Sequence, residues 1–271
     1  MTKAKWWDVT WNYVSGCHPI SDGCKNCYAQ RMSKRLVGRF GYPKDDPFRP
    51  GITHDTAEMK PFLWTKPRRI FVCSMGDLFH DAVSYETLKC IFNIMRMNLR
   101  HRFIILTKRP KRMREVIPYL LNDLRTFTGQ EYFTNIDLGV TVENNNEMWR
   151  IAELFHTPAA IRFACFEPLL EFIDTSFFEG LDGRSYWPFA GLWGIKDPAA
   201  EDGLVSDEFV KLDWVIAGPE TGSGKRPYDL EWSKRILADC RSFNIPFFYK
   251  GNDWPDAEIY YRDLPDYMKE K

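Results

Sequence analysis

The fold is decided by the stretch FIILTKRP, which runs from Phe103 to Pro110. It begins with a continuous apolar run, and such runs are typical of parallel strands that are buried on both faces. It ends in a proline, which is favoured at the first position of a helix. Apolar residues then recur at helical spacing from Met113 to Leu124. The stretch therefore predicts the turn of a strand-helix unit.

Similar units recur along the chain. One helix is expected after Ser84, a favoured N-cap residue, and another from Trp232 to Phe243. The runs that predict strands are Trp7–Trp11, Arg69–Cys73, Phe103–Leu106, Ile136–Val142, Ile161–Phe166, Trp214–Ala217 and Pro246–Tyr249. This alternation predicts an α/β fold, namely a full or partial TIM-like (β/α) barrel, with a doubly wound sheet as the alternative.

We expect residues 1–271 to form a single barrel domain. Two stretches of the chain do not follow the alternation of strands and helices. Residues 40–64 contain Pro and Gly, and they predict a surface connection with little regular structure. Residues 175–212 form a long link between the fifth and sixth strands, and its aromatic residues argue against disorder. We interpret this link as an insertion or a lid.

Barrel enzymes carry their active sites at the carboxyl ends of the strands. In this chain, polar or charged residues follow nearly every expected strand, among them Asp77, Lys108, Arg109, Thr141, Glu143, Glu167, Glu220 and Lys250. Strands of any protein end in polar loops, which is the alternative explanation. We interpret these residues as a functional site around the opening of the barrel at the carboxyl ends of its strands.

The sequence CHPISDGCKNCY, from Cys17 to Tyr28, places three cysteines at C-x6-C-x2-C spacing. A [4Fe-4S] cluster takes one thiolate per iron, so Cys17, Cys24 and Cys27 would leave one iron open. An open iron is where S-adenosylmethionine is chelated and cleaved to a radical. Two alternatives remain: a zinc site that uses His18, although this residue adjoins Cys17, and a redox pair of Cys24 and Cys27.

The remaining cysteines and the composition indicate a reducing compartment. Cys73, Cys90, Cys165 and Cys240 lie in apolar patterns and are expected to be buried free thiols. The chain has no apolar run of about 18 residues and no secretory leader, so we expect a cytoplasmic protein that does not enter a membrane. Its 37 basic and 37 acidic residues cancel, so any attraction to nucleic acid must be local.

Residues after the second and third expected strands are candidates for binding S-adenosylmethionine. Gly76 would let the backbone approach the cofactor, and Asp77 would accept a hydrogen bond from its ammonium group. The sequence Met75-Gly76-Asp77 resembles the Gly-Gly-Glu motif that radical S-adenosylmethionine enzymes place at this strand end. Further candidates are Lys108 or Arg109 for the carboxylate, and Thr141 or Glu143 for the ribose. Ordinary loop salt bridges are the alternative for each.

Five of the seven residues from Lys108 to Arg114 are basic. They stand at the start of an expected helix, where positive charge opposes the helix dipole and a bound anion would be stabilising. We interpret them as a phosphate or nucleic-acid contact, with a solvated helix face as the alternative. The residues expected to bind the substrate are Arg109, Arg112, Glu167, Glu220 and Lys250.

Several blocks of the sequence carry a family resemblance: Trp11–Cys17, Cys24–Ala29, Ser74–His80, Leu106–Pro110, Glu167–Leu170 and Phe247–Lys250. Together they resemble a phage-encoded, three-cysteine family that is similar to radical S-adenosylmethionine enzymes and is described only as phage proteins of unknown function. The resemblance runs from Trp6 to Trp254. It implies a barrel related to radical enzymes such as spore photoproduct lyase, in a phage or prophage setting.

The sequence thus predicts a radical S-adenosylmethionine enzyme that takes hydrogen from a nucleic-acid base or a nucleotide. The favoured task is thymidine hypermodification of phage DNA, and the reaction subclass (isomerase, lyase or transferase) is left open. The expected cofactors are a [4Fe-4S] cluster and S-adenosyl-L-methionine. An external electron donor such as flavodoxin is expected, and a further protein partner is left open. The alternatives are a radical DNA-repair lyase and a non-catalytic zinc or iron-sulfur protein that binds nucleic acid.

Overall fold

The computed structural model describes residues 5–124, 131–190, 192–196, 204–251 and 265–269. Its largest sheet has seven strands in the order β1-β4-β5-β6-β7-β12-β13. They are β1 (Val9–Trp11), β4 (Arg69–Val72), β5 (Arg102–Thr107), β6 (Ile136–Thr141), β7 (Ile161–Phe166), β12 (Trp214–Ala217) and β13 (Phe247–Tyr249). The pairs β1/β4, β4/β5, β7/β12 and β12/β13 are parallel. All seven predicted strands are therefore confirmed.

The strand order follows the chain order without a reversal. A doubly wound sheet reverses its order at a switch point, whereas a (β/α) barrel adds each strand beside the preceding one. The structure is therefore an α/β fold that is compatible with a partial (β/α) barrel, in which β1 and β13 are the two ends of the order.

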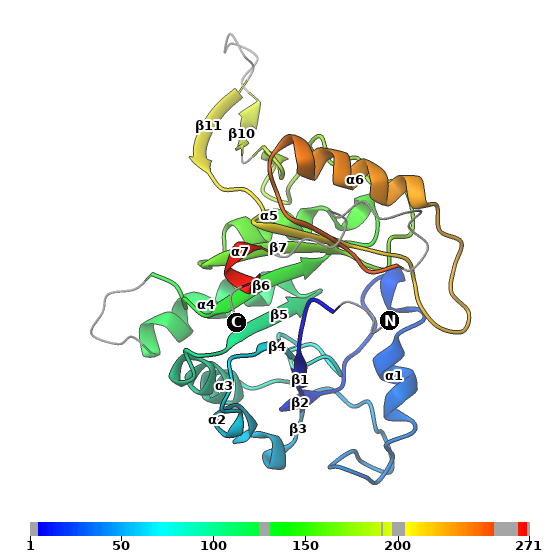
Figure 1. The fold of residues 1–271 in the computed structure, drawn as a ribbon, viewed down its shortest axis with the longest axis vertical. Helices are drawn as coiled ribbons and strands as arrows, with labels where there is room; N and C mark the ends of the chain where they lie inside the picture. The colour runs from blue at the N-terminus through cyan, green and yellow to red at the C-terminus, as the bar shows by residue number, and fades with distance from the viewer. Residues whose placement is uncertain (1–4, 125–130, 191, 197–203, 252–264, 270–271) are drawn as a thin grey trace. The chain divides into compact units, whose positions relative to one another are not determined.

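The chain divides into two compact units, of which the first consists mainly of Met1–Gly139. It holds β1, β4 and β5, together with the helices α3 (Tyr85–Met97) and α4 (Pro110–Asp123), which contact each other (Figure 1). The hydroxyl of Ser84 accepts a hydrogen bond from the backbone N–H of Thr87 at 3.1 Å, so the predicted N-cap is confirmed. The apolar faces predicted for both helices are buried at Leu88, Ile91, Phe92, Met95, Met113, Ile117 and Leu120.

Residues 40–64 differ from the predicted surface connection. They contain β3 (Ile52–Thr53), which pairs with β2 (Val14–Ser15) in an antiparallel ladder, and the one-turn helix α2 (Lys60–Leu63). Tyr42, Ile52 and His54 are buried. The segment therefore has little regular structure, as predicted, but part of it is buried and does not lie at the surface.

The second unit consists mainly of residues 140–156 and 161–270. It holds β7, β12 and β13, and the last two strands are buried along their whole length. Helix α6 (Leu230–Ser242) contacts β12 and β13, and α5 (Trp149–Phe155) contacts β7. Helix α6 confirms the helix predicted near Trp232, and the Asp229 side chain caps it by accepting from the N–H of Glu231.

The long link between β7 and β12 forms a small sheet of its own. Its four antiparallel strands have the order β11-β10-β9-β8: β8 (Phe178–Glu179), β9 (Ser185–Trp187), β10 (Leu192–Lys196) and β11 (Leu204–Phe209). The rings of Phe178 and Tyr186 stack with their centroids 5.3 Å apart. The link is therefore a folded insertion, while its use as a lid stays a prediction.

The other helical elements are short. They are α1 (Tyr28–Ser33), α7 (Asp266–Lys269) and the 3-10 turns η1 (Asp22–Cys24), η2 (Asp55–Ala57) and η3 (Asn145–Glu147). Within the described ranges, no helix is both long and apolar enough to span a bilayer.

Candidate functional site

The three clustered cysteines lie on one loop of the first unit. Cys17 follows β2, Cys24 ends η1, and Cys27 immediately precedes α1. The backbone N–H of Cys27 donates to the carbonyl oxygen of Cys24 at 3.2 Å, which closes a tight turn between these two residues. All three are free thiols with partly exposed side chains. The loop therefore presents three accessible sulfur donors.

Two glycines hold this loop against the end of β4. The N–H of Gly16 donates to the carbonyl oxygen of Met75 at 3.0 Å, and Gly16 forms a parallel bridge with Gly76. A Cβ atom on Gly76 would lie 2.7 Å from the carbonyl oxygen of Gly16, closer than such atoms can approach. Gly76 was predicted to admit a cofactor to the backbone. In the structure, the absence of a side chain on Gly76 allows the backbone of Gly16 to approach it closely. This contact holds the residue that precedes Cys17.

Asp77 is buried at the same strand end, and its carboxylate accepts four hydrogen bonds. Oδ1 accepts from the N–H of Phe79 at 3.0 Å and from the hydroxyl of Thr107 at 2.7 Å. Oδ2 accepts from the N–H of Lys108 at 3.1 Å and from Nη1 of Arg109 at 3.3 Å. The two oxygens of a carboxylate can accept about four hydrogen bonds in total. Donors from the protein itself therefore occupy the acceptor positions of Asp77.

Arg109 joins this carboxylate to the cysteine loop. Its Nη1 lies 3.2 Å from the sulfur of Cys17, and its Nη2 donates to the carbonyl oxygen of His18 at 3.0 Å. Burial raises the pKa of the Cys17 thiol to about 11, with a smaller upward contribution from Asp77, while Arg109 lowers it. A metal ligand must lose this proton, and the guanidinium is the group that favours its loss. The structure thus brings Cys17, Asp77 and Arg109 together.

A histidine pair lies beside the same loop. Nε2 of His80 is 3.3 Å from Nδ1 of His18. Because Nδ1 of His80 accepts from the N–H of Ala82 at 3.0 Å, its proton is on Nε2 and is donated to His18. Burial, followed by the charge of Arg109, lowers the pKa of His80. His80 was not among the predicted site residues, although its place just after the Met75–Asp77 motif was the available signal.

The arrangement of the thiols bears on which metal group they fit. Among the residues that the structure describes, no three or more His, Cys, Asp or Glu side chains converge on a point where one metal ion would sit. A structural zinc ion needs four ligands around one centre. The ligands of a [4Fe-4S] cluster each hold a different iron and need not converge in this way. Three free thiols match the donor set of a [4Fe-4S] cluster with one open iron, and this match concerns residue type alone.

Arg112, one of the basic residues on α4 predicted to contact phosphate, already donates hydrogen bonds within the chain. The guanidinium of Arg112 donates through Nη1 to the carbonyl oxygen of His80 and through Nη2 to that of Val83. Arg112 therefore closes the turn that precedes α3, and a phosphate would have to compete with these carbonyl groups. Lys111 and Arg114 are exposed on the first turns of α4.

In the second unit, Thr141 and Glu143 share one buried partner. Nη1 of Arg150 donates to the carbonyl oxygen of Thr141 and to Oε2 of Glu143, each at 2.8 Å. Nη2 of Arg150 pairs with Glu147 at 2.7 Å. The side chains of Glu143 and Arg150 are almost fully buried. Glu143 and Arg150 therefore form an ion pair that is shielded from water. The ribose contacts predicted for Thr141 and Glu143 stay predictions.

The other charged residues predicted in this unit are also paired. Glu167, after β7, forms an ion pair with Lys250, after β13. The carboxylate of Glu220 accepts from the N–H of Arg226 at 2.8 Å, from its Nε at 3.0 Å and from its Nη2 at 2.5 Å. The structure therefore brings Glu167 and Lys250 together and gives Glu220 a separate cationic partner.

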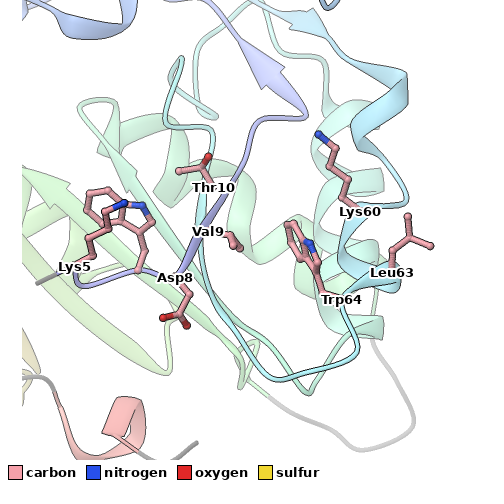
Figure 2. A pocket seen from close by; sticks show the side chains of 8 residues that line it. Lys5, Asp8, Val9, Thr10, Lys60, Leu63 and Trp64 are labelled. Carbon is pink, nitrogen blue, oxygen red and sulfur yellow. The ribbon is translucent and has the colours of Figure 1, made fainter. Parts of the chain in front are cut away.

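A pocket of about 570 Å³ lies beside β1 in the first unit. Figure 2 shows Val9 and Thr10 of this strand between Lys5 on one side and Lys60, Leu63 and Trp64 on the other. The remaining lining residues are Trp7 and Asp8. None of the predicted site residues lines this pocket, so it is distinct from the cysteine loop.

The fold and the site define an α/β protein, compatible with a partial (β/α) barrel, that carries a loop with three thiols beside the end of β4. The chain belongs to a family described as a protein of unknown function (DUF5131), whose family model matches residues 1–262. That description assigns neither an activity nor a cofactor. No curated protein and no solved structure matches the chain.

Proposed function

We propose that this protein is a radical S-adenosylmethionine enzyme that holds a [4Fe-4S] cluster on Cys17, Cys24 and Cys27. The observation that carries the proposal is the set of three free, partly exposed thiols on one loop at the carboxyl end of β4. The sequential order of the parallel sheet supports a radical-enzyme type of barrel, because such folds work at this end of their strands. When bound, the cluster supplies the electron that cleaves S-adenosylmethionine to a hydrogen-abstracting radical.

The residues around the loop have separate roles in this proposal. Gly16 and Gly76 hold the loop in place, and the half-buried Lys108 is the candidate partner for the carboxylate of the cofactor. Asp77 receives the cofactor's ammonium only if one of its donors leaves, and its contact with Arg109, at 3.3 Å, is the longest of its four.

The proposed substrate is a nucleic-acid base or a nucleotide, with thymidine of phage DNA in a bacterial cytoplasm as the favoured case. Exposed Lys111 and Arg114 at the start of α4 support a phosphate contact. Glu167 and Lys250, paired in the second unit, are the candidates there for polar groups of the substrate. An electron donor of the flavodoxin type would reduce the cluster.

Anaerobic reconstitution with iron and sulfide tests the proposal. We expect about four irons per chain, and we expect 5'-deoxyadenosine after addition of dithionite and S-adenosylmethionine. Changing Cys17, Cys24 or Cys27 to Ala should in each case remove the iron-sulfur absorbance near roughly 400 nm, because each thiolate holds one iron.

Cys90→Ala is the matched control, since Cys90 is a partly exposed thiol on α3 and away from the loop in sequence. It should retain full iron content. A protein that binds one zinc ion per chain and yields no 5'-deoxyadenosine would instead be a non-catalytic module that binds nucleic acid.

A further inference from the structure

Arg109 was predicted to contact the substrate, but its guanidinium lies against the cysteine loop. Nη1 is 3.2 Å from the sulfur of Cys17, and Nη2 is 3.0 Å from the carbonyl oxygen of His18. The side chain is only 12% exposed, so its charge is poorly screened by water. The planar fork of a guanidinium fixes both contacts at once.

Asp77 holds this guanidinium in place. Three of its four donors, from Phe79, Thr107 and Lys108, anchor the carboxylate between the ends of β4 and β5. The fourth donor is Nη1 of Arg109. The hydroxyl of Thr107 also accepts from the backbone N–H of Arg109 at 2.9 Å, which fixes the main chain that carries the side chain. The negative charge of Asp77 offsets the cost of burying the cation.

The three thiols are consequently not equivalent. Cys17 has a permanent cation at hydrogen-bond distance, whereas the sulfur of Cys24 lies 3.8 Å from the neutral hydroxyl of Ser21. Hydrogen bonds and positive charge at a ligating sulfur stabilise the more reduced, more negative state of an iron-sulfur centre.

We propose that Arg109 is a positioning residue of the cysteine centre, held by Asp77 and Thr107, and that its contact with Cys17 raises the reduction potential of the bound cluster. The part that concerns the potential rests on the proposed function. The part that concerns the position of Arg109 does not, because it needs no cluster.

The first arm of the test uses the reconstituted protein. In an anaerobic redox titration followed by electron paramagnetic resonance, Arg109→Gln should make reduction of the cluster about tenfold less favourable, a shift of ~59 mV for one electron. Arg109→Lys keeps the charge but loses the fork, so its shift should be smaller. Arg235→Gln, at an exposed position on α6, is the control and should leave the potential unchanged.

The second arm uses cluster-free protein labelled with ¹⁵N-arginine. The guanidinium protons of Arg109 should exchange with water more slowly than those of exposed arginines, and Thr107→Val or Asp77→Asn should remove this protection. The use of two variants guards against the failure of one to fold. If the parent assembles no cluster, the proposed function fails and this arm alone decides the position of Arg109.

Equal potentials in the parent and in a folded Arg109→Gln protein would overturn the assignment to the cluster. Unchanged protection in a folded Thr107→Val or Asp77→Asn protein would overturn the positioning role. A lowered potential together with lost protection supports the whole inference.

Discussion

At the scale of single residues, several polar groups predicted to bind ligands already have partners within the chain. The carboxylate of Asp77 accepts four hydrogen bonds, Glu143 pairs with buried Arg150, and Arg112 donates to two carbonyl groups. A buried charged group needs such partners before it can serve any other purpose, because desolvation without them is strongly unfavourable.

Glu143→Gln tests whether this carboxylate is structural. The amide has nearly the same shape but removes the charge of Glu143, so that of the two carboxylates paired with the buried guanidinium of Arg150 only that of Glu147 remains. We expect the free energy of unfolding in urea to fall by about 3 kcal/mol, the lower end for breaking a buried pair. Glu231→Gln, in an exposed pair with Lys234, is the control and should change stability by less than about 0.5 kcal/mol. Parental stability combined with lost cofactor affinity would make Glu143 a ligand instead.

At the scale of elements, the ends of the strands position the thiols. Cys17 follows β2, and Gly76 and Asp77 lie in the turn after β4. Strand β5 ends at Thr107, two residues before Arg109. The close approach of Gly16 to Gly76 joins two of these elements directly. The geometry of the loop therefore depends on a backbone contact as well as on side chains.

Gly76→Ala should disturb this contact, because the added Cβ would lie 2.7 Å from a backbone oxygen that has no rotamer to change. We expect a loss of roughly 1–3 kcal/mol in the free energy of unfolding. We also expect fewer irons per chain after reconstitution, measured by a colorimetric iron assay.

Gly183→Ala is the control for this experiment. Its Cβ would meet nothing within 4 Å, although its φ of 76° makes any side chain unfavourable there. It should therefore lower stability without lowering iron content. Equal iron losses in the two variants would show that general destabilisation, and not the Gly16 contact, limits cluster uptake.

At the scale of the whole molecule, equal numbers of acidic and basic residues leave no net charge to attract a polyanion. Many of the cations singled out by the sequence are also engaged internally, as Arg109 and Lys250 show. The nucleic-acid contact proposed above uses Lys111 and Arg114, which are exposed at the start of α4.

Stability should also fall in mild acid. Burial lowers the pKa of both His54 and His101 from the ordinary value of 6.5. The unfolded chain therefore binds more protons than the folded chain just below pH 6.5, so stability is fully present above this pH and is lost as the pH falls. Nδ1 of His54 donates to the carbonyl oxygen of Phe40, leaving Nε2 to accept from Ser15, and protonation of Nε2 would force the hydroxyl of Ser15 to turn from donor to acceptor.

Urea unfolding at pH 7.5, 6.5 and 5.5 measures this dependence. His54→Gln and His101→Asn should each make the free energy of unfolding less dependent on pH between 6.5 and 5.5. The same slope in both variants as in the parent would mean that other groups control acid sensitivity.

The sequence by itself determined the order of the seven strands of the main sheet, the longer helices between them and the place of the cysteine loop in the chain. Apolar runs such as Phe103–Leu106 and the N-cap at Ser84 depend on neighbours in the chain, and periodicity and capping report on such neighbours. The same local patterns did not reveal the β2/β3 pairing, because each of these strands has only two residues.

Only the tertiary structure decided which partners the site residues have. Arg109 reaches Cys17 across 92 positions of sequence, and Asp77 reaches Thr107 across 30. The sequence around a basic or acidic residue does not distinguish whether its side chain binds a ligand, a backbone carbonyl group or an oppositely charged side chain. The choice among these depends on which strand ends the sheet brings together, and on the high cost of leaving a buried charge without a partner.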